Sequence, residues 1–339
     1  MAQKKVKFVI VGYGHIGKRH AAMVTGNELG EVVAVVEPMD DRRADADSTY
    51  GCPVFATTEE LYQSGVEMDV VNVCTPNGLH SDQAIEALSA RSHVVIEKPM
   101  GLHKAKCEEV IHKALQYSKK VFLVKQNRYS PTSEWLKSLM EEEKLGEIYM
   151  VQLNCYWNRD SRYYKPDGWK GSLDMDGGTL FTQFSHFIDI MYWLFGDVDN
   201  ISGRSTNFSH PNTEFEDTGV VNFDFVNGGM GSMNFSTSVW GQNLESSITV
   251  IGEKGSVKVA GQYMDKVDYC HVQDYEMPQL APSNPPNDYG EYKGSAANHH
   301  YVIQNVVDVI TGKSEIATNA LEGMKVVEMI ERIYKIVRD

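Results

Sequence analysis

The chain has 339 residues, of which 42% are hydrophobic and 23% are charged, and its formal net charge is −14. This length exceeds that of one ordinary hydrophobic core and predicts two domains. An acidic chain without a long basic run is a poor partner for nucleic acid or anionic membranes. No apolar run approaches the length of a signal core or a membrane span, so we expect a cytoplasmic protein with no membrane partner.

The first part of the chain alternates between strand and helix signals. Short apolar, β-branched runs predict strands at residues 6–12, 31–38, 69–76, 93–99 and 121–127. Helical patterns fall between them, at residues 16–24, 80–90 and 104–120. Because the strands are apolar almost throughout, this alternation predicts an α/β domain with a doubly wound parallel sheet over residues 1–127.

The pattern changes after residue 148. Alternating apolar and polar residues around Gly-rich turns are typical of antiparallel hairpins, and they occur at residues 149–158, 218–239 and 246–261. Helical patterns that would cover one face of such a sheet lie at residues 178–195, 298–310 and 319–337. We therefore expect residues 128–339 to form an α+β domain.

The stretch VIVGYGHIGKRH contains a dinucleotide-binding pattern. Gly12, Gly14 and Gly17 form G-x-G-x-x-G directly after a predicted strand and at the start of a predicted helix. Glycine permits the tight turn, the close approach of a pyrophosphate and the packing of helix on strand. Glu37 ends the second strand, where a carboxylate accepts hydrogen bonds from ribose hydroxyls and repels a 2′-phosphate, which favours NAD over NADP. The alternatives are a plain glycine-rich turn and, because two arginines follow Glu37 closely, NADP.

Two further strand ends carry polar residues. The stretch HVVIEKPMGL places Glu97 and Lys98 between a buried strand and Pro99. A proline restricts the backbone, so Lys98 is held in a fixed position at the end of the strand. A lysine that is only solvated does not need this restriction, whereas a lysine that must direct its ammonium group at a ligand benefits from it. The stretch NVCTPNGLH places Thr75 at the carboxyl edge of the sheet, where doubly wound folds bind ligands. The plainer interpretation of the first stretch is a surface Glu–Lys pair.

The spacing of GYGHIG, CTPNGLH, EKP and KQNRYSP resembles that of the Gfo/Idh/MocA oxidoreductases, which are nicotinamide-dependent sugar and inositol dehydrogenases. The resemblance implies a Rossmann domain, then a domain with a large open antiparallel sheet that covers the nicotinamide and forms a homo-oligomer, a dimer or tetramer. It implies NAD as the cofactor. The implied cofactor-binding residues are Gly12, Tyr13, Gly14, His15, Ile16, Glu37, Thr75, Pro76, His80, Glu97, Lys98 and Gln126.

The same resemblance implies two catalytic residues, Lys98 and His186. In the family the lysine of E-K-P lies between nicotinamide and substrate, and a histidine near the substrate hydroxyl follows an acidic position by four residues. This chain has Thr182 at that acidic position, so the proton route rests on Lys98 and His186, with help from Gln183. A neutral imidazole suits general-base catalysis near pH 7, although its apolar surroundings alone would indicate a core histidine.

Three segments resemble the sequences of one branch of the family, the UDP-N-acetylglucosaminuronate (UDP-GlcNAcA) dehydrogenases. The segments are QNRYSP, CYWNR and DGGTLFTQFSHFIDIMYWLFG. It implies oxidation of the sugar C3 hydroxyl to a 3-keto sugar for bacterial surface polysaccharide (O-antigen) biosynthesis. Cations and aromatic residues interleave between residues 155 and 178, as expected of a loop that holds an anionic, ring-bearing ligand. The expected substrate-binding residues are Lys98, Arg128, Arg159, Arg162, Tyr163, Gln183 and His186.

Two other functions stay open at this point. A dehydrogenase of a free sugar or inositol would need no diphosphate contacts, and a non-catalytic nucleotide-sensing protein would need neither Lys98 nor His186. We predict no metal site, because the five cysteines are scattered and His299 and His300 have no carboxylate at ligand spacing in the sequence. A helix cap and a packing contact are the expected roles of these two histidines.

Overall fold

The structure is a computed structural model that describes residues 4–166 and 168–338. The chain forms two compact units. The first comprises Met1–Lys125 and His299–Val327, and the second comprises Gln126–Asn298 and Glu328–Asp339. Within the described residues, no helix is both long and apolar enough to cross a membrane.

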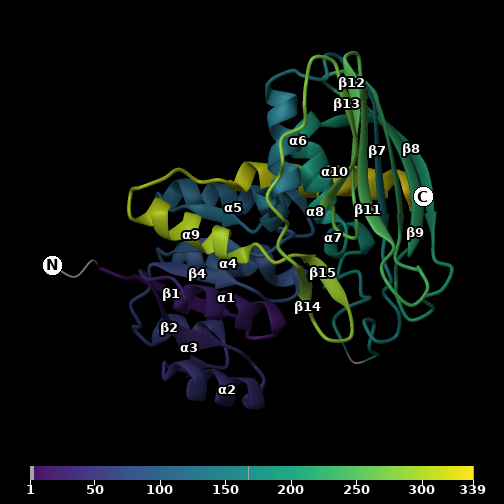
Figure 1. Cartoon of the computed structure of the whole chain (residues 1–339). Helices are drawn as coiled ribbons and strands as arrows, with labels where there is room; N and C mark the ends of the chain where they lie inside the picture. The colour runs from purple at the N-terminus through teal and green to yellow at the C-terminus, as the bar shows by residue number, and fades with distance from the viewer. Residues whose placement is uncertain (1–3, 167, 339) are drawn as a thin grey trace. The chain divides into compact units, whose positions relative to one another are not determined.

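The first unit contains a six-stranded sheet in the order β3-β2-β1-β4-β5-β6 (Figure 1). All its neighbouring strands are parallel, so the predicted doubly wound sheet is confirmed. The strands are β1 (Val6–Val11), β2 (Gly30–Val36), β3 (Val54–Phe55), β4 (Val70–Val73), β5 (His93–Ile96) and β6 (Val121–Leu123). The sequence predicted all of these strands except β3, and their apolar residues are mostly buried, since helices on both faces shield a parallel sheet from water.

Five helices and one 3₁₀ turn connect these strands: α1 (His15–Thr25), α2 (Asp40–Tyr50), α3 (Thr58–Gln63), η1 (Asn77–Leu79), α4 (His80–Ser89) and α5 (Lys104–Tyr117). The sequence did not predict α2, because the segment DDRRADADSTY has no apolar period and buries only Ala46. It begins with two acids, which stabilise the positive end of a helix. The β–α–β crossover, and not an amphipathic pattern, therefore accounts for this helix.

The first unit also contains a segment from the far end of the chain. The helix α9 (His299–Ile310) contacts α1, and the start of α10 (Ala320–Val337) follows it (Figure 1). The Thr318 hydroxyl donates to the Leu123 carbonyl, and Gly323 leaves room for the Leu123 side chain. The sequence placed all residues after 127 in the second domain. The observed units differ, because His299–Val327 belongs to the first unit. Apolar faces of these helices, not chain order, decide where the segment packs.

The second unit contains a seven-stranded sheet in the order β13-β12-β11-β7-β10-β9-β8. Its strands are β7 (Ile148–Tyr156), β8 (Val198–Thr206), β9 (Thr218–Phe225), β10 (Met230–Ser236), β11 (Glu245–Gly252), β12 (Gly255–Ala260) and β13 (Lys266–Val272). The pair β7 and β10 is parallel and the other pairs are antiparallel. The sheet is therefore mixed, whereas the hairpin patterns predicted an antiparallel one.

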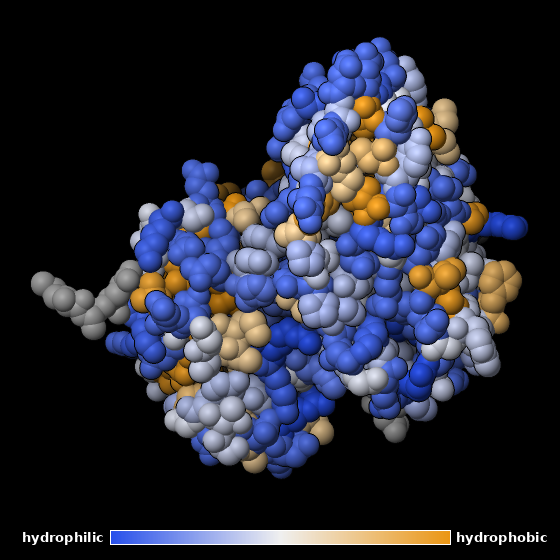
Figure 2. All heavy atoms as spheres, viewed as in Figure 1, coloured by the Kyte–Doolittle hydropathy of each residue, from blue (hydrophilic) through white to orange (hydrophobic). Residues whose placement is uncertain are grey.

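Strands of this sheet bury one face and expose the other. In β9, buried and exposed residues alternate strictly from Gly219 to Phe225. Exposed apolar side chains on the open face include Met150, Val220, Met230 and Ile251. On the side of the molecule shown in Figure 2, hydrophilic surface predominates and apolar side chains form small separate groups.

The remaining elements of the second unit are η2 (Gln126–Tyr129), α6 (Pro131–Glu141), α7 (Thr179–Thr182), α8 (Ser185–Phe195), β14 (Pro286–Asp288), β15 (Lys293–Ala296) and the end of α10. The helix predicted over residues 178–195 is divided, because Gln183 and Phe184 separate α7 from α8. This interruption sets the direction of the helix that carries His186.

Candidate active site

The glycine-rich turn lies between β1 and α1 and has a shape that only glycine permits. Gly12 has a φ of +86°, and a Cβ there would lie 2.8 Å from the Thr75 methyl group. A Cβ on Gly17 would lie 1.9 Å from the Gly12 carbonyl oxygen. Gly14, in contrast, faces open space, since the nearest atom to its Cβ would be an Arg42 nitrogen at 3.9 Å. The turn thus leaves an open cradle before the N-terminus of α1, which suits a pyrophosphate.

Glu37 follows β2 and is held by backbone donors. Its Oε2 accepts a hydrogen bond from the Tyr13 N–H at 2.8 Å, and its Oε1 accepts one from the Met39 N–H at 3.1 Å. Each carboxylate oxygen has two lone pairs, so both retain capacity for a ribose hydroxyl. An Arg42 nitrogen lies 3.8 Å from Oε1 and partly offsets the repulsion that the carboxylate exerts on a 2′-phosphate. These residues fit NAD.

The loop after β4 is joined to the loop after β5 through one histidine. His80 Nε2 lies 2.8 Å from the Thr75 carbonyl oxygen, and Nδ1 lies 2.7 Å from the Pro99 carbonyl oxygen. The Thr75 hydroxyl donates to the Gln83 side chain at 2.6 Å. His80 therefore lies between two predicted cofactor loops, with one ring nitrogen close to a carbonyl oxygen of each.

Lys98 stands at the end of β5 beside a buried acid. Glu97 is 5% exposed, and its Oε2 accepts a hydrogen bond from the Lys98 N–H at 3.1 Å. Burial alone raises the pKa of Glu97, but a hydrogen bond with His20 at 3.0 Å and the His299 imidazole, whose Nε2 lies 3.5 Å away, hold that pKa well below its usual range. The structure thus corrects the expectation for His299, because its carboxylate partner comes from β5 and not from its own helix.

His186 lies on the first turn of α8 and is buried. Position 182 lacks the expected acid, but another acid lies beside it in the fold. The Thr182 hydroxyl donates a hydrogen bond to the Asp176 carboxylate. Asp176 is itself 1% exposed and accepts a second hydrogen bond from the Gly171 N–H at 2.9 Å. The second unit therefore keeps a buried carboxylate beside Thr182, at a position that its sequence spacing did not indicate.

Arg159 is a buried cation that has no carboxylate partner within the described residues. It is 2% exposed, and its guanidinium donates only to oxygens of amides and carbonyls, one of them Gln183 Oε1 at 2.9 Å. Its guanidinium carbon lies 5.2 Å from the Tyr163 ring centre and 5.2 Å from that of Tyr292. Burial lowers the pKa of Arg159. An arginine in this setting is suited to receive an anionic group.

The other two predicted substrate arginines already have acidic partners. Arg128 forms two hydrogen bonds of 2.8 Å with the Asp189 carboxylate, and both side chains are buried. Arg162 is exposed and pairs with Asp160 at 2.7 Å. An internal carboxylate thus neutralises the charge of each of these two guanidinium groups, whereas the charge of Arg159 has no carboxylate partner within the described residues.

Several buried polar atoms near the predicted residues have no hydrogen-bond partner within the described part of the chain. They are Gln183 Nε2, Gln126 Oε1, Ser185 Oγ and both amide atoms of Asn127. Buried polar atoms without partners are costly and frequently mark places where a ligand or water binds. The sequence predicted a role for Gln126 and Gln183 and missed Asn127 and Ser185, although Asn127 belongs to the KQNRYSP motif.

A hollow of about 610 Å³ in the second unit lies elsewhere. It is lined by the end of α6, the start of β7 and neighbouring turns, including Leu139, Leu194 and Lys254. None of the predicted site residues lines it. The hollow therefore does not bear on the chemistry of Lys98 or His186.

A glycine cradle at a helix N-terminus and a carboxylate after the second strand define a dinucleotide-binding oxidoreductase unit. Residues 6–125 match the profile of the oxidoreductase family with an NAD-binding Rossmann fold, and residues 134–258 match the Gfo/Idh/MocA C-terminal domain. The chain belongs to the Gfo/Idh/MocA family of oxidoreductases. This confirms the family, the fold class and NAD as the cofactor.

Two solved structures are similar over almost the whole chain. The WlbA dehydrogenase of Bordetella pertussis is 30% identical, with a TM-score of 0.89 over 99% of this chain and 97% of that one. The WlbA dehydrogenase of Chromobacterium violaceum is also 30% identical, with a TM-score of 0.89 over 100% and 95%. Both were crystallised with NADH and UDP-GlcNAcA.

Curated relatives are more distant and more varied. Glucose-6-phosphate 3-dehydrogenase of Bacillus subtilis is 26% identical over 84% of this chain and 83% of its own. Inositol 2-dehydrogenase of Rhizobium meliloti is 22% identical over 98% and 97%. An uncharacterised oxidoreductase of Synechocystis is 25% identical, and the match spans 60% of that protein.

Proposed function

We propose that the protein is an NAD-dependent dehydrogenase that oxidises the C3 hydroxyl of UDP-GlcNAcA to a 3-keto sugar. The observation that carries this proposal is the full-length similarity, at 30% identity, to two dehydrogenases crystallised with NADH and UDP-GlcNAcA. The glycine cradle and Glu37 provide the binding site for NAD that this reaction requires, and Arg159 provides a buried cation for an anionic substrate.

The reaction breaks a C–H and an O–H bond and forms a carbonyl. NAD held by the glycine cradle and Glu37 would supply the hydride acceptor for C3. His186 is the proposed base that takes the hydroxyl proton, and the Lys98 ammonium is the proposed group that stabilises the negative charge on the oxygen. Glu97 contributes by holding the main chain of Lys98 through its 3.1 Å hydrogen bond. The alternative assignment has Lys98 as the base and His186 as the hydrogen-bond donor to the oxygen.

Recognition of the uronate carboxylate is assigned to Arg159. Its guanidinium has no acidic partner in the described residues, and the Tyr163 and Tyr292 rings lie beside it, each with its centre 5.2 Å from the guanidinium carbon. Gln183 joins this group, because its oxygen accepts from Arg159 and its amide nitrogen has no partner among the described residues. A substrate with both a carboxylate and polar ring substituents would satisfy these groups together.

The test is a substrate panel monitored by NADH absorbance, including a single-turnover arm in which reduction of bound NAD is followed. UDP-GlcNAcA should react at least roughly tenfold faster than UDP-N-acetylglucosamine, glucuronate, glucose 6-phosphate and myo-inositol, because remote binding energy positions C3. NMR of the product should show a ketone at C3. Equal reaction of a free sugar would replace this proposal with the alternative below.

The alternative is a dehydrogenase of a free or phosphorylated sugar or of inositol. The relatives from Bacillus subtilis and Rhizobium meliloti favour it, since they match most of this chain. The internal pairing of Arg128 and Arg162 also fits a substrate without a diphosphate. Under this alternative, glucose 6-phosphate or inositol would be the best substrate of the panel and UDP would not inhibit.

We also propose that the protein prefers NAD to NADP and assembles through the open face of the second sheet. Titration of NAD and NADP should give the tighter binding for NAD. Glu37→Ala should reduce the difference between the two affinities, because it removes the charge that repels a 2′-phosphate.

For the assembly, the support comes from exposed apolar side chains on β10 and β11. The double variant Met230→Lys/Ile251→Lys should then lower the mass measured by light scattering, and an unchanged mass would contradict that interface.

A further inference from the structure

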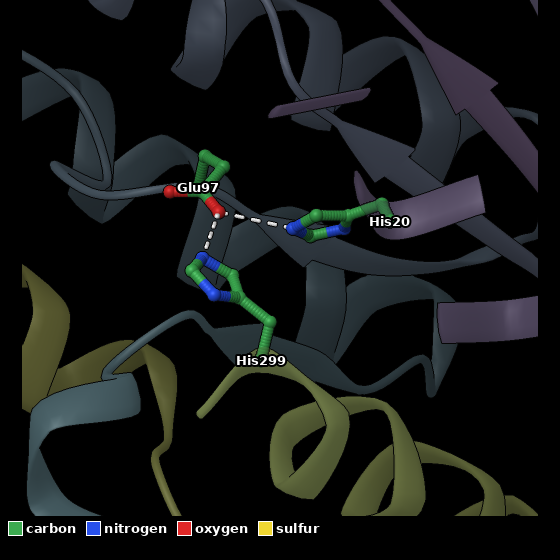
Figure 3. A group of neighbouring side chains, drawn as sticks. All are labelled: His20, Glu97 and His299. Carbon is green, nitrogen blue, oxygen red and sulfur yellow. Dashed lines mark hydrogen bonds and ion pairs between the residues drawn. The ribbon is translucent and has the colours of Figure 1, made fainter. Parts of the chain in front are cut away.

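A cluster of two histidines and one glutamate is buried at the end of β5 (Figure 3). His20 comes from α1, Glu97 follows β5, and His299 begins α9, so all three belong to the first unit. Glu97 Oε1 lies 3.0 Å from His20 Nε2 and 3.5 Å from His299 Nε2. Their side chains are 6%, 1% and 3% exposed for Glu97, His20 and His299. One carboxylate oxygen therefore faces two imidazoles and almost no water.

The proton positions in this cluster follow from Asn72 on β4. The Asn72 amide nitrogen lies 3.1 Å from His20 Nδ1. As the amide is assigned, it donates to Nδ1, which leaves the ring proton on Nε2, directed at Glu97 Oε1. A chain of hydrogen bonds thus runs from Asn72 through His20 to Glu97, and from Glu97 Oε2 to the Lys98 N–H.

No lysine or arginine forms an ion pair with Glu97 in the described part of the chain, so the two imidazoles are its partners. Other titratable groups within electrostatic reach of the cluster are Cys74, His80 and Arg19. The charges of Glu97 and Lys98 both act on the pKa of His80, which burial lowers. A fixed negative charge therefore stands next to the proposed catalytic lysine.

We propose that His20 and His299 are positioning residues for Lys98, which hold Glu97 as a carboxylate so that it fixes the Lys98 main chain and keeps the ammonium protonated. The proposal rests on the catalytic role proposed for Lys98. The second imidazole comes from α9, the helix that the chain adds to the first unit after residue 298. The site acts on the lysine through Glu97 and does not touch the substrate.

A metal ion held by the same three side chains is the competing explanation. Two imidazoles and a carboxylate are suitable ligands for divalent transition metals. With the Asn72 amide assigned as above, its contact directs a proton, not a lone pair, from His20 towards Glu97, and this assignment favours the network.

The first test needs no substrate. Competitive acetylation of the NAD-free protein across a pH series, followed by mass spectrometry, gives the apparent pKa of Lys98. Glu97→Gln keeps the shape of the side chain and removes its charge, so it should lower that pKa by about one pH unit. His299→Phe should lower it in the same direction by less, and His300→Phe, at the exposed neighbouring position, should leave it unchanged.

The second test is a double-mutant cycle on single-turnover hydride transfer. His299→Phe alone should slow the step at least roughly fivefold, and the same change in a Glu97→Gln background should have little further effect, because both act through one carboxylate. NAD affinity should stay within about twofold in the single variant His299→Phe. His20→Gln provides a second cycle if His299→Phe does not fold.

The outcomes separate this inference from the proposed function. If Lys98 acetylation is unaffected by Glu97→Gln, or if the histidine and glutamate effects simply add, the positioning role is wrong, whatever the substrate. Stoichiometric zinc, iron or manganese in the purified protein, lost in His299→Phe, would also overturn it in favour of a metal site. Inactivity of the wild type on UDP-GlcNAcA with a normal acetylation result would instead refute the proposed substrate alone.

Discussion

The Arg128–Asp189 pair supports a quantitative prediction about stability. Two hydrogen bonds of 2.8 Å join the side chains, which are 5% and 2% exposed. Asp189→Asn keeps the size of the side chain but leaves a buried guanidinium without its counter-charge. Breaking a buried pair in this way costs about 3–5 kcal/mol of unfolding free energy. In a unit of this size each kcal/mol shifts Tm by about 2–4 °C, so we expect a fall of at least roughly 6 °C.

The assay is thermal unfolding followed by near-ultraviolet circular dichroism. Asp160→Asn is the matched control, because Asp160 makes the same kind of pair with Arg162 at the surface, where such pairs contribute at most about 1 kcal/mol. The double variant Arg128→Met/Asp189→Leu should recover most of the lost stability, since it removes both charges. A fall in Tm for Asp189→Asn no larger than that for Asp160→Asn would refute the reasoning.

Three further predictions concern the cofactor turn, the chemistry and pH. Gly14→Ala should abolish NAD binding measured by calorimetry with little change in Tm, because its Cβ would lie no closer than 3.9 Å to the nearest protein atom. Gly17→Ala should abolish NAD binding and also lower Tm, because its Cβ would lie 1.9 Å from a carbonyl oxygen. Lys98→Met and His186→Asn should each lower turnover at least roughly 100-fold with NAD affinity nearly unchanged, and near-normal turnover in both would end the catalytic assignment. Burial and two neighbouring lysines lower the pKa of His93 to about 4, and its Nδ1 accepts the Lys120 N–H at 2.9 Å. As pH falls from about 6.5 to 4, His93 takes up a proton in the unfolded chain but not in the folded one. This difference alone should lower the stability by about 2 kcal/mol, allowing for partial exposure. The loss of stability over this pH range, measured by urea titration, should therefore be smaller by about that amount in His93→Gln than in the wild type.

The sequence by itself determined the features that depend on short-range patterns. Apolar runs located β1, β4 and β5, because a strand covered on both faces must be apolar throughout. The spacing of Gly12, Gly14 and Gly17 located the cofactor turn, because steric limits on a tight turn act within a few residues. Motif spacing likewise identified the family before the structure did, and it drew attention to Lys98 at the end of β5.

Only the tertiary structure decided which distant groups meet. Glu97 faces His20 and His299, and Arg128 pairs with Asp189, although nothing local marks these partners. The helix α2 formed without an apolar period because the crossover between β2 and β3 requires an element there. The sequence shows which side chains are charged, but the packing of distant segments determines which partner neutralises a buried charge. For this reason Arg159, with no acid beside it in the described residues, differs from Arg128 and Arg162 in a way that the sequence could not reveal.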